Sequence, residues 1–151
     1  MASDEALKPF LGTWTAVRMQ DDEYNDVLQK QGVPWPMRKV LGSFTAAREV
    51  ALDGSQRVML KSKNIIGGWS EVILGEPQTF EMMGYKLETL AVWEDGMIKV
   101  TCRTTAEAGM LTAAVDITTK MTHHINEDGE LVITTVAPEG QYLMWMARDE
   151  P

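Results

Sequence analysis

The side chains best suited to catalysis or metal binding lie in the last third of this sequence. His123 and His124 are the only two histidines, and Cys102 is the only cysteine. An imidazole can serve as a general base, a metal ligand or a polar group in a binding cavity. Adjacent residues of a strand point to opposite faces, so at most one of the two histidines can face a given cavity. One imidazole is too few ligands for a metal, and we therefore predict no metal site.

Signatures of catalysis are missing from the sequence. It contains no Gly-x-Ser-x-Gly elbow and no glycine-rich phosphate loop. No histidine neighbours Cys102, which we interpret as a small buried side chain. The acidic run Asp21-Asp22-Glu23 is placed to favour a helix start, where negative charge complements the helix dipole. We expect neither enzymatic activity nor a cofactor.

Composition narrows the class of protein. A chain of 151 residues is expected to form one domain, spanning residues 1–151. A single cysteine allows no internal disulfide, which indicates a reducing compartment. The first residues are acidic where a secretory signal is basic, and no run approaches the ~18 apolar residues of a membrane span. With a net charge of −8 and scattered basic residues, we expect a soluble cytoplasmic protein with no nucleic-acid partner.

The first 40 residues combine one strand with two short helices. The segment 10–19 begins with the apolar, β-prone residues Phe-Leu-Gly-Thr-Trp. Apolar side chains recur at helical spacing over 21–31, and Gly32 follows as a helix stop. A second helix is expected to start near Pro34, because proline is tolerated in the first helical turn. The two helices form a hairpin over about residues 21–41.

Beyond this hairpin the sequence alternates between β-prone runs and turn residues. Asp-Gly and Glu-Gly pairs separate several of the runs and supply the positive φ that tight hairpins need. A meander of about ten antiparallel strands tends to close into an up-and-down barrel, and one of that size leaves an internal cavity. The predicted strands are 10–19, 45–52, 57–63, 68–74, 79–83, 86–93, 97–104, 111–126, 130–137 and 141–148. The predicted fold class is all-β.

Four segments, in this order, resemble those of the intracellular lipid-binding proteins, which include fatty-acid-binding and cellular retinoid-binding proteins. They are Phe-Leu-Gly-Thr-Trp at 10–14, the run from Tyr24 to Val33 with Arg38-Lys39, Leu-Gly-Glu at 74–76, and Asp-Gly-Glu-Leu-Val at 128–132. The resemblance covers essentially the whole chain. It implies a calycin-like barrel of ten strands, with Trp14 buried under the barrel floor as a core residue and a helix-turn-helix lid after the first strand.

The resemblance also implies a ligand site, although the usual carboxylate anchor is altered. The family's Arg-x-Tyr motif in the last strand corresponds to Met146-Ala147-Arg148, and its other inward arginine corresponds to His124. Methionine donates no hydrogen bond and a neutral imidazole donates only one, whereas arginine can hold a carboxylate with two. The implied ligand-binding residues are Arg148, Met146, His124, Tyr142, Met144, Ile133 and Thr135 in the barrel, with Tyr24, Leu28, Met37 and Ile66 at the entrance.

The position of His124 depends on the segment 104–126, which is longer than the family pattern. A longer hairpin loop around residues 106–109 or a bulge near Thr118 would accommodate the extra residues. The sequence leaves both possibilities open.

The resulting hypothesis is a monomeric carrier that binds a fatty acid or another hydrophobic small molecule, with possible transient membrane contact through the lid. One alternative is a haem-binding barrel enzyme of the nitrobindin type, with His123 or His124 as the axial ligand. Another is a barrel whose cavity has filled with its own methionines and tryptophans and binds nothing.

Overall fold

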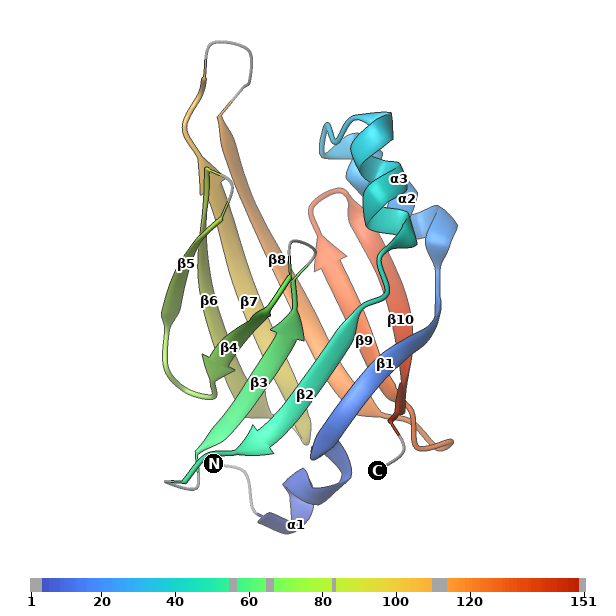
Figure 1. Ribbon diagram of the computed structural model, residues 1–151, viewed down its shortest axis with the longest axis vertical. Helices are drawn as coiled ribbons and strands as arrows, with labels where there is room; N and C mark the ends of the chain where they lie inside the picture. Colours follow the sequence, from blue (N-terminus) through green and yellow to red (C-terminus); the bar gives the residue numbers. More distant parts are fainter. Residues whose placement is uncertain (1–3, 55–56, 65–66, 83, 110–113, 150–151) are drawn as a thin grey trace.

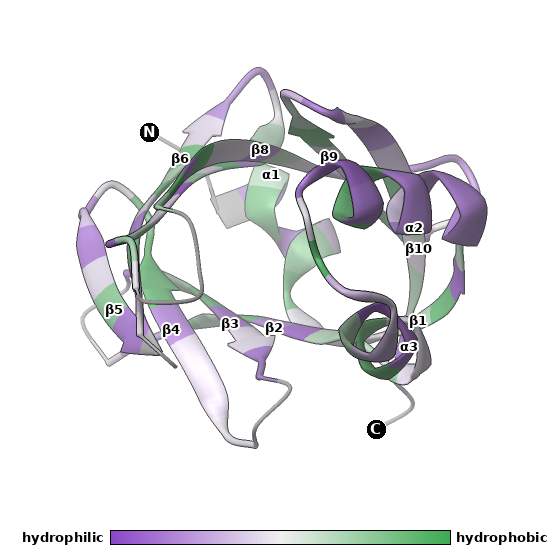
Figure 2. Ribbon diagram, turned by 90° about the horizontal axis from the view of Figure 1, so that it is seen from above, coloured by the Kyte–Doolittle hydropathy of each residue, from purple (hydrophilic) through white to green (hydrophobic). Residues whose placement is uncertain are grey.

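Ten antiparallel strands form one sheet that curves into a nearly closed barrel (Figures 1 and 2). The computed structural model describes residues 4–54, 57–64, 67–82, 84–109 and 114–149. The strand order is β4-β3-β2-β1-β10-β9-β8-β7-β6-β5, so that β4 and β5 are the two ends of the sheet. The strands are β1 (Gly12–Met19), β2 (Ala47–Leu52), β3 (Val58–Lys63), β4 (Trp69–Ile73), β5 (Gln78–Met82), β6 (Tyr85–Glu94), β7 (Met97–Ala106), β8 (Val115–Ile125), β9 (Leu131–Ala137) and β10 (Gly140–Arg148). The predicted barrel is confirmed.

A tight turn connects β6 and β7 at Asp95-Gly96. Between β6 and β7, Asp95 and Gly96 have φ values of 55° and 73°, and Glu94 pairs directly with Met97. Positive φ at both central residues is typical of a type I′ turn, which suits the twist of a two-residue hairpin.

Two helices cover part of one end of the barrel (Figure 2). The first, α2 (Asp21–Lys30), carries three acidic residues in its first turn, and Gly32 follows it with a φ of 84°. The second, α3 (Trp35–Ser43), begins after Pro34. This arrangement confirms the helical hairpin, and the second helix ends two residues later than predicted.

The opposite end of the barrel has a short helical segment that the sequence did not predict. A helical turn, α1 (Asp4–Leu7), leads into a 3₁₀ turn, η1 (Lys8–Phe10). The side chains of Leu7 and Phe10 are both buried, and the Phe10 ring packs edge-on against Trp93 at 5.4 Å between ring centroids. The predicted strand start at Phe10 is therefore wrong, because this residue belongs to the turn and the strand begins at Gly12.

The register between β7 and β8 decides between the two explanations for the long segment 104–126. Pairing is unbroken from Ile98 opposite His123 to Ala106 opposite Val115. No bulge interrupts it near Thr118, so the additional residues extend the two strands and their connection.

The core lies inside the barrel and begins with Trp14, which is fully buried. Its indole Nε1 donates a hydrogen bond of 2.9 Å to the carbonyl of Phe10. This confirms the expectation that Trp14 is a core residue. The hydrogen bond connects the first strand to the turn that closes the floor.

Candidate ligand cavity

A cavity of about 190 Å³ lies within the barrel. Its lining residues alternate along the strands with residues of the outer face, as expected for inward positions. The apolar lining residues are Leu60, Val72, Phe80, Leu87, Val100 and Met121. The polar lining residues are Arg48, Ser62, Asn64, Ser70, Thr89 and Cys102. The cavity thus combines apolar walls with one cationic group.

Arg48 of β2 is that cation, and it was not among the residues predicted from the sequence. It lies opposite the core residue Trp14 in the β1–β2 pairing, and its Nη1 donates a hydrogen bond of 3.2 Å to the carbonyl of Ala47. Burial lowers the pKa of Arg48 to about 10, an effect partly opposed by Tyr142. The guanidinium therefore remains charged at neutral pH. The sequence does contain a signal for this position. Arg48 is two residues from both Ala46 and Val50, which face the core, and residues two apart on a strand point to the same face.

Tyrosine and threonine side chains extend this polar region toward the lid. Tyr142 of β10 is half-buried and lies opposite Thr135 of β9. The Tyr142 ring also packs against Tyr24 of α2, with 4.8 Å between ring centroids. Burial raises the pKa of Tyr24 to about 12 and raises that of Tyr142 as well. Both phenols are therefore neutral at physiological pH and can donate hydrogen bonds.

His123, rather than His124, is the inward histidine. It lies opposite the core residues Ile98 and Ile133, is only 1% exposed, and has its Nδ1 3.2 Å from the Ile98 carbonyl. A carbonyl can only accept, so Nδ1 carries the proton and Nε2 is a bare acceptor, with no partner among the described residues. Burial, followed by the charge of Arg48, lowers the pKa of His123 to about 3.

The prediction that His124 faces the cavity is wrong. This residue lies opposite Val132 on the other face of the β8–β9 pair. Counting from the turn at Gly129 gave a register that was off by one residue. The correct face can be read from the alternation along β8. Met121 and Ile125 are apolar and face the core, and His123, halfway between them, shares their face.

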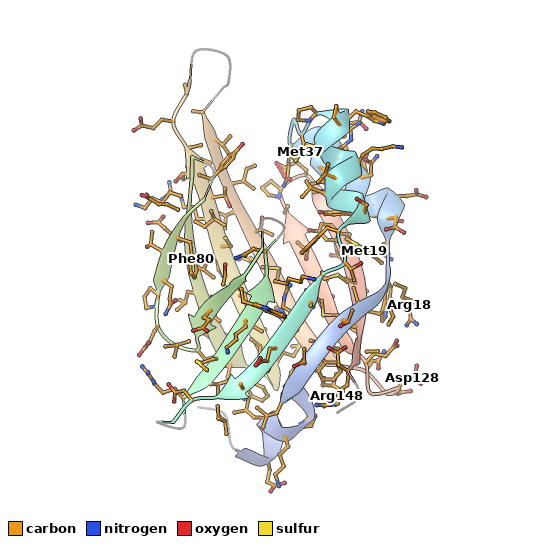
Figure 3. All side chains as sticks on the ribbon, viewed as in Figure 1. Arg18, Met19, Met37, Phe80, Asp128 and Arg148 are labelled. Atoms are coloured by element: carbon orange, nitrogen blue, oxygen red, sulfur yellow. The ribbon has the colours of Figure 1, made fainter. Side chains whose placement is uncertain are left out.

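Arg148 occupies the floor of the barrel instead of the cavity. Its Nη2 donates a hydrogen bond of 2.6 Å to the carbonyl of Pro9, and its Nη1 donates to that of Leu11. Figure 3 shows Arg148 at the end of the barrel opposite Met37. The guanidinium is thus engaged at the floor, where it cannot act as the predicted ligand anchor.

The other predicted barrel residues lie on the inner face of β9 and β10. Met146 and Ile133 are at most 1% exposed and belong to the core, together with Met144. Thr135 is also buried, and Tyr142 is half-buried. None of this group is among the residues that line the cavity, and Tyr142 is the one that interacts electrostatically with Arg48.

The predicted entrance residues lie on the two helices, apart from Ile66, which falls outside the described residues. Tyr24 and Leu28 of α2 are half-buried, whereas Met37 of α3 is 42% exposed. None of the residues of α3 is buried. This helix is held mainly through α2, with Arg38 donating a hydrogen bond of 3.1 Å to Asn25.

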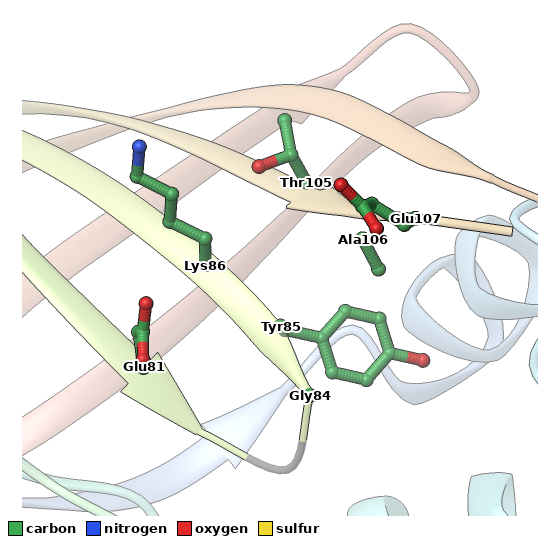
Figure 4. A pocket seen from close by; sticks show the side chains of 7 residues that line it. All are labelled: Glu81, Gly84, Tyr85, Lys86, Thr105, Ala106 and Glu107. Carbon is green, nitrogen blue, oxygen red and sulfur yellow. The ribbon is translucent and has the colours of Figure 1, made fainter. Parts of the chain in front are cut away.

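A second hollow of about 560 Å³ lies at the rim, beside the β5–β6 turn. Its lining includes the charged residues Glu81, Lys86 and Glu107, with the Tyr85 ring standing at its edge (Figure 4). It is larger than the internal cavity, but its lining is much more polar. A polar hollow buries little of a hydrophobic ligand, and we therefore regard the internal cavity as the candidate site.

The described residues contain no group of three or more His, Cys, Asp or Glu side chains that could hold a metal ion. None of the described helices is long and apolar enough to cross a membrane.

Comparison with known proteins identifies the fold through structure alone. No family model and no curated protein sequence matches the chain. Fatty-acid-binding protein 1 of Echinococcus granulosus superposes with a TM-score of 0.71 and 16% identity, covering 95% of this chain and 99% of its own. Lipid binding protein 8 of Caenorhabditis elegans superposes with a TM-score of 0.69 and 16% identity, and the match covers 99% of both chains. A Schistosoma mansoni fatty-acid-binding protein in complex with arachidonic acid superposes with a TM-score of 0.69 and 16% identity, and the match covers 96% of this chain and 99% of its own. The chain therefore has the ten-stranded, helix-capped barrel fold of the fatty-acid-binding proteins.

Proposed function

We propose that this protein is a non-enzymatic carrier that binds a hydrophobic small molecule, such as a fatty acid, inside the barrel. The observation that carries the proposal is the cavity of about 190 Å³ among inward apolar side chains. Burial of apolar ligand surface contributes ~25 cal/mol per Å² and would supply most of the affinity. The same proposal describes a cytoplasmic monomer whose lid helices touch membranes transiently through exposed residues such as Trp35 and Met37.

The size of the cavity bears on the choice among hypotheses. At about 190 Å³ it is smaller than the roughly 300 to 1,000 Å³ of most small-molecule sites. This favours a compact ligand over a porphyrin and so speaks against the haem-binding alternative. Buried Met144 and Met146 fill part of the interior, but the remaining space also speaks against a completely filled barrel.

Native mass spectrometry of the purified protein, followed by solvent extraction and identification of retained lipid, tests the proposal. A fluorescent hydrophobic probe titrated against delipidated protein supplies the affinity. We expect one probe molecule to bind and to be displaced by octanoic acid. If the protein retains no lipid and neither the probe nor octanoic acid binds, the carrier function is refuted. A Soret band upon haem titration that is lost in His123→Ala would instead support the haem protein.

Two neighbouring substitutions separate cavity binding from surface binding. Cys102 lines the cavity, whereas Thr101 is exposed on the other face of β7. Cys102→Phe is expected to fill the cavity and abolish probe binding, while Thr101→Phe leaves it intact. Equal binding by both variants would locate the probe outside the cavity.

A further inference from the structure

Arg48 is a cation directed inward without a counter-charge. No ion pair joins it to any carboxylate in the described part of the chain, and its hydrogen bond to the Ala47 carbonyl engages one of five guanidinium donors. In contrast, Glu49, the next residue, points outward and pairs with Lys61 at 3.8 Å. Charged groups removed from water are normally paired, because an uncompensated buried charge costs free energy.

Among the described residues, the cavity walls offer no anion to compensate this charge. Its twelve lining residues include hydroxyl, amide and thiol groups but neither Asp nor Glu. Hydroxyl and amide groups solvate a cation without neutralising it. A negative charge in this cavity must therefore arrive with a ligand.

We propose that Arg48 anchors the carboxylate of a compact hydrophobic acid whose apolar part occupies the cavity. This inference rests on the proposed carrier function and adds the chemical class of the ligand and the residue that selects it. A guanidinium can hold a carboxylate through two parallel charge-assisted hydrogen bonds. The apolar residues Leu60, Val72, Phe80, Leu87, Val100 and Met121 surround the rest of the ligand.

Two polar side chains, those of Tyr142 and His123, interact electrostatically with Arg48. The phenol of Tyr142 adds to the polar surroundings of Arg48. His123 offers only the bare acceptor Nε2, which repels a carboxylate oxygen. The anchor therefore lies on β2, at Arg48, and not at the inward histidine of β8.

Matched ligands test this assignment. Octanoic acid and 1-octanol have the same carbon chain but differ in charge at pH 7.4. Calorimetric titration of the full delipidated chain should show that the acid binds about 10- to 100-fold more tightly than the alcohol, the range expected for hydrogen bonds to a charged group. In Arg48→Met this preference should disappear through weaker binding of the acid, while alcohol binding remains. Arg48→Lys keeps the positive charge but cannot donate two parallel hydrogen bonds from a planar group. It should retain part of the preference for the acid over the alcohol.

The matched control is Arg103→Met. Arg103 belongs to β7, whose inner face contributes to the cavity, but it points outward and holds Asp116 through two hydrogen bonds of 2.9 Å. This variant should keep the full preference for the acid. Because an internal pair is screened little by salt, the preference should also persist at 0.5 M NaCl.

The outcomes separate this inference from the carrier function. If acid and alcohol bind the unmodified protein equally, or if Arg48→Met retains the preference, the anchor assignment is wrong while the carrier function stands. If neither ligand binds, both are wrong. If Arg103→Met loses the preference as fully as Arg48→Met does, the acid is held at the surface, and the assignment is again wrong. Circular dichroism of each variant establishes that the barrel is folded before titration.

Discussion

The guanidinium carbon of Arg148 lies 4.4 Å from the centroid of the Trp14 ring. From this position its nitrogens donate to the carbonyls of Pro9 and Leu11, so one side chain connects the last strand, the first strand and the floor turn. The contact combines a cation–π interaction with hydrogen bonds from a charged donor. It gives Arg148 a structural role at the closed end of the barrel.

This arrangement predicts that Arg148→Met lowers stability without changing ligand binding. Loss of the two hydrogen bonds and the ring contact should reduce the free energy of unfolding by about 1 to 3 kcal/mol. Urea denaturation measures this loss, and calorimetry with octanoic acid measures binding. A variant with unchanged stability but markedly weaker binding of the acid would restore Arg148 to the ligand site.

Gly12 allows Arg148 to take this position. Its φ of 129° is unfavourable for residues with a side chain, and a Cβ atom built there would lie 2.5 Å from Nη1 of Arg148. Gly12→Ala should therefore cost about 1 to 3 kcal/mol in urea denaturation. The matched control is Gly42→Ala within α3, where the added Cβ meets no described atom within 4 Å apart from its chain neighbours and its own helix backbone, and stability should rise slightly. Comparable effects at the two positions would contradict the strain at Gly12.

The sequence was sufficient for the barrel and the lid because their signals are local. Turn residues such as Asp95-Gly96 and the helix stop at Gly32 mark element ends without information from distant residues. The floor helix is too short, at four residues, to show a periodic pattern.

The site was harder to predict because it depends on register and on long-range contacts. A one-residue slip exchanged His123 for His124, since each step along a strand reverses the face. The guanidinium of Arg148 is held by backbone carbonyls of residues 137 or more positions away, and the sequence of the last strand carries no sign of them. Arg48 was overlooked as one of many scattered charges.

His123 predicts a specific loss of stability in acid. Its pKa is about 3 in the folded protein and about 6.5 in the unfolded chain, so only the unfolded chain takes up a proton between these values. The contribution of His123 to the free energy of unfolding is therefore fully present above pH 6.5 and is lost progressively as the pH falls toward 3. Between pH 7 and pH 5 the decline amounts to about 2 kcal/mol.

Urea denaturation at pH 7, 6 and 5 measures this effect. In His123→Gln, the fall in the free energy of unfolding between pH 7 and pH 5 should be smaller by the same amount. Identical slopes for the unmodified protein and His123→Gln would contradict the burial of a neutral imidazole.

The lid should be the least protected part of the barrel assembly. Helix α3 has no buried residue, whereas Val27 of α2 is buried and lies close to Gly140 at the start of β10. Val27→Ala removes apolar contact from this docking point and should increase amide hydrogen exchange throughout α2 and α3, with little change in β7 to β9. Val40→Ala, on the exposed side of α3, is the matched control. Uniform acceleration across the strands in Val27→Ala would show that the lid does not open separately.

The most direct test of an occupied internal cavity uses Cys102, the only cysteine, which lines it. The rate of maleimide labelling is measured with and without saturating octanoic acid, the acid's affinity being known from calorimetry. A ligand inside the cavity covers the thiol, and the rate is expected to fall at least about tenfold, in proportion to the occupied fraction. An unchanged labelling rate at an octanoic acid concentration that saturates the calorimetric site would show that the ligand binds elsewhere and would contradict the carrier account.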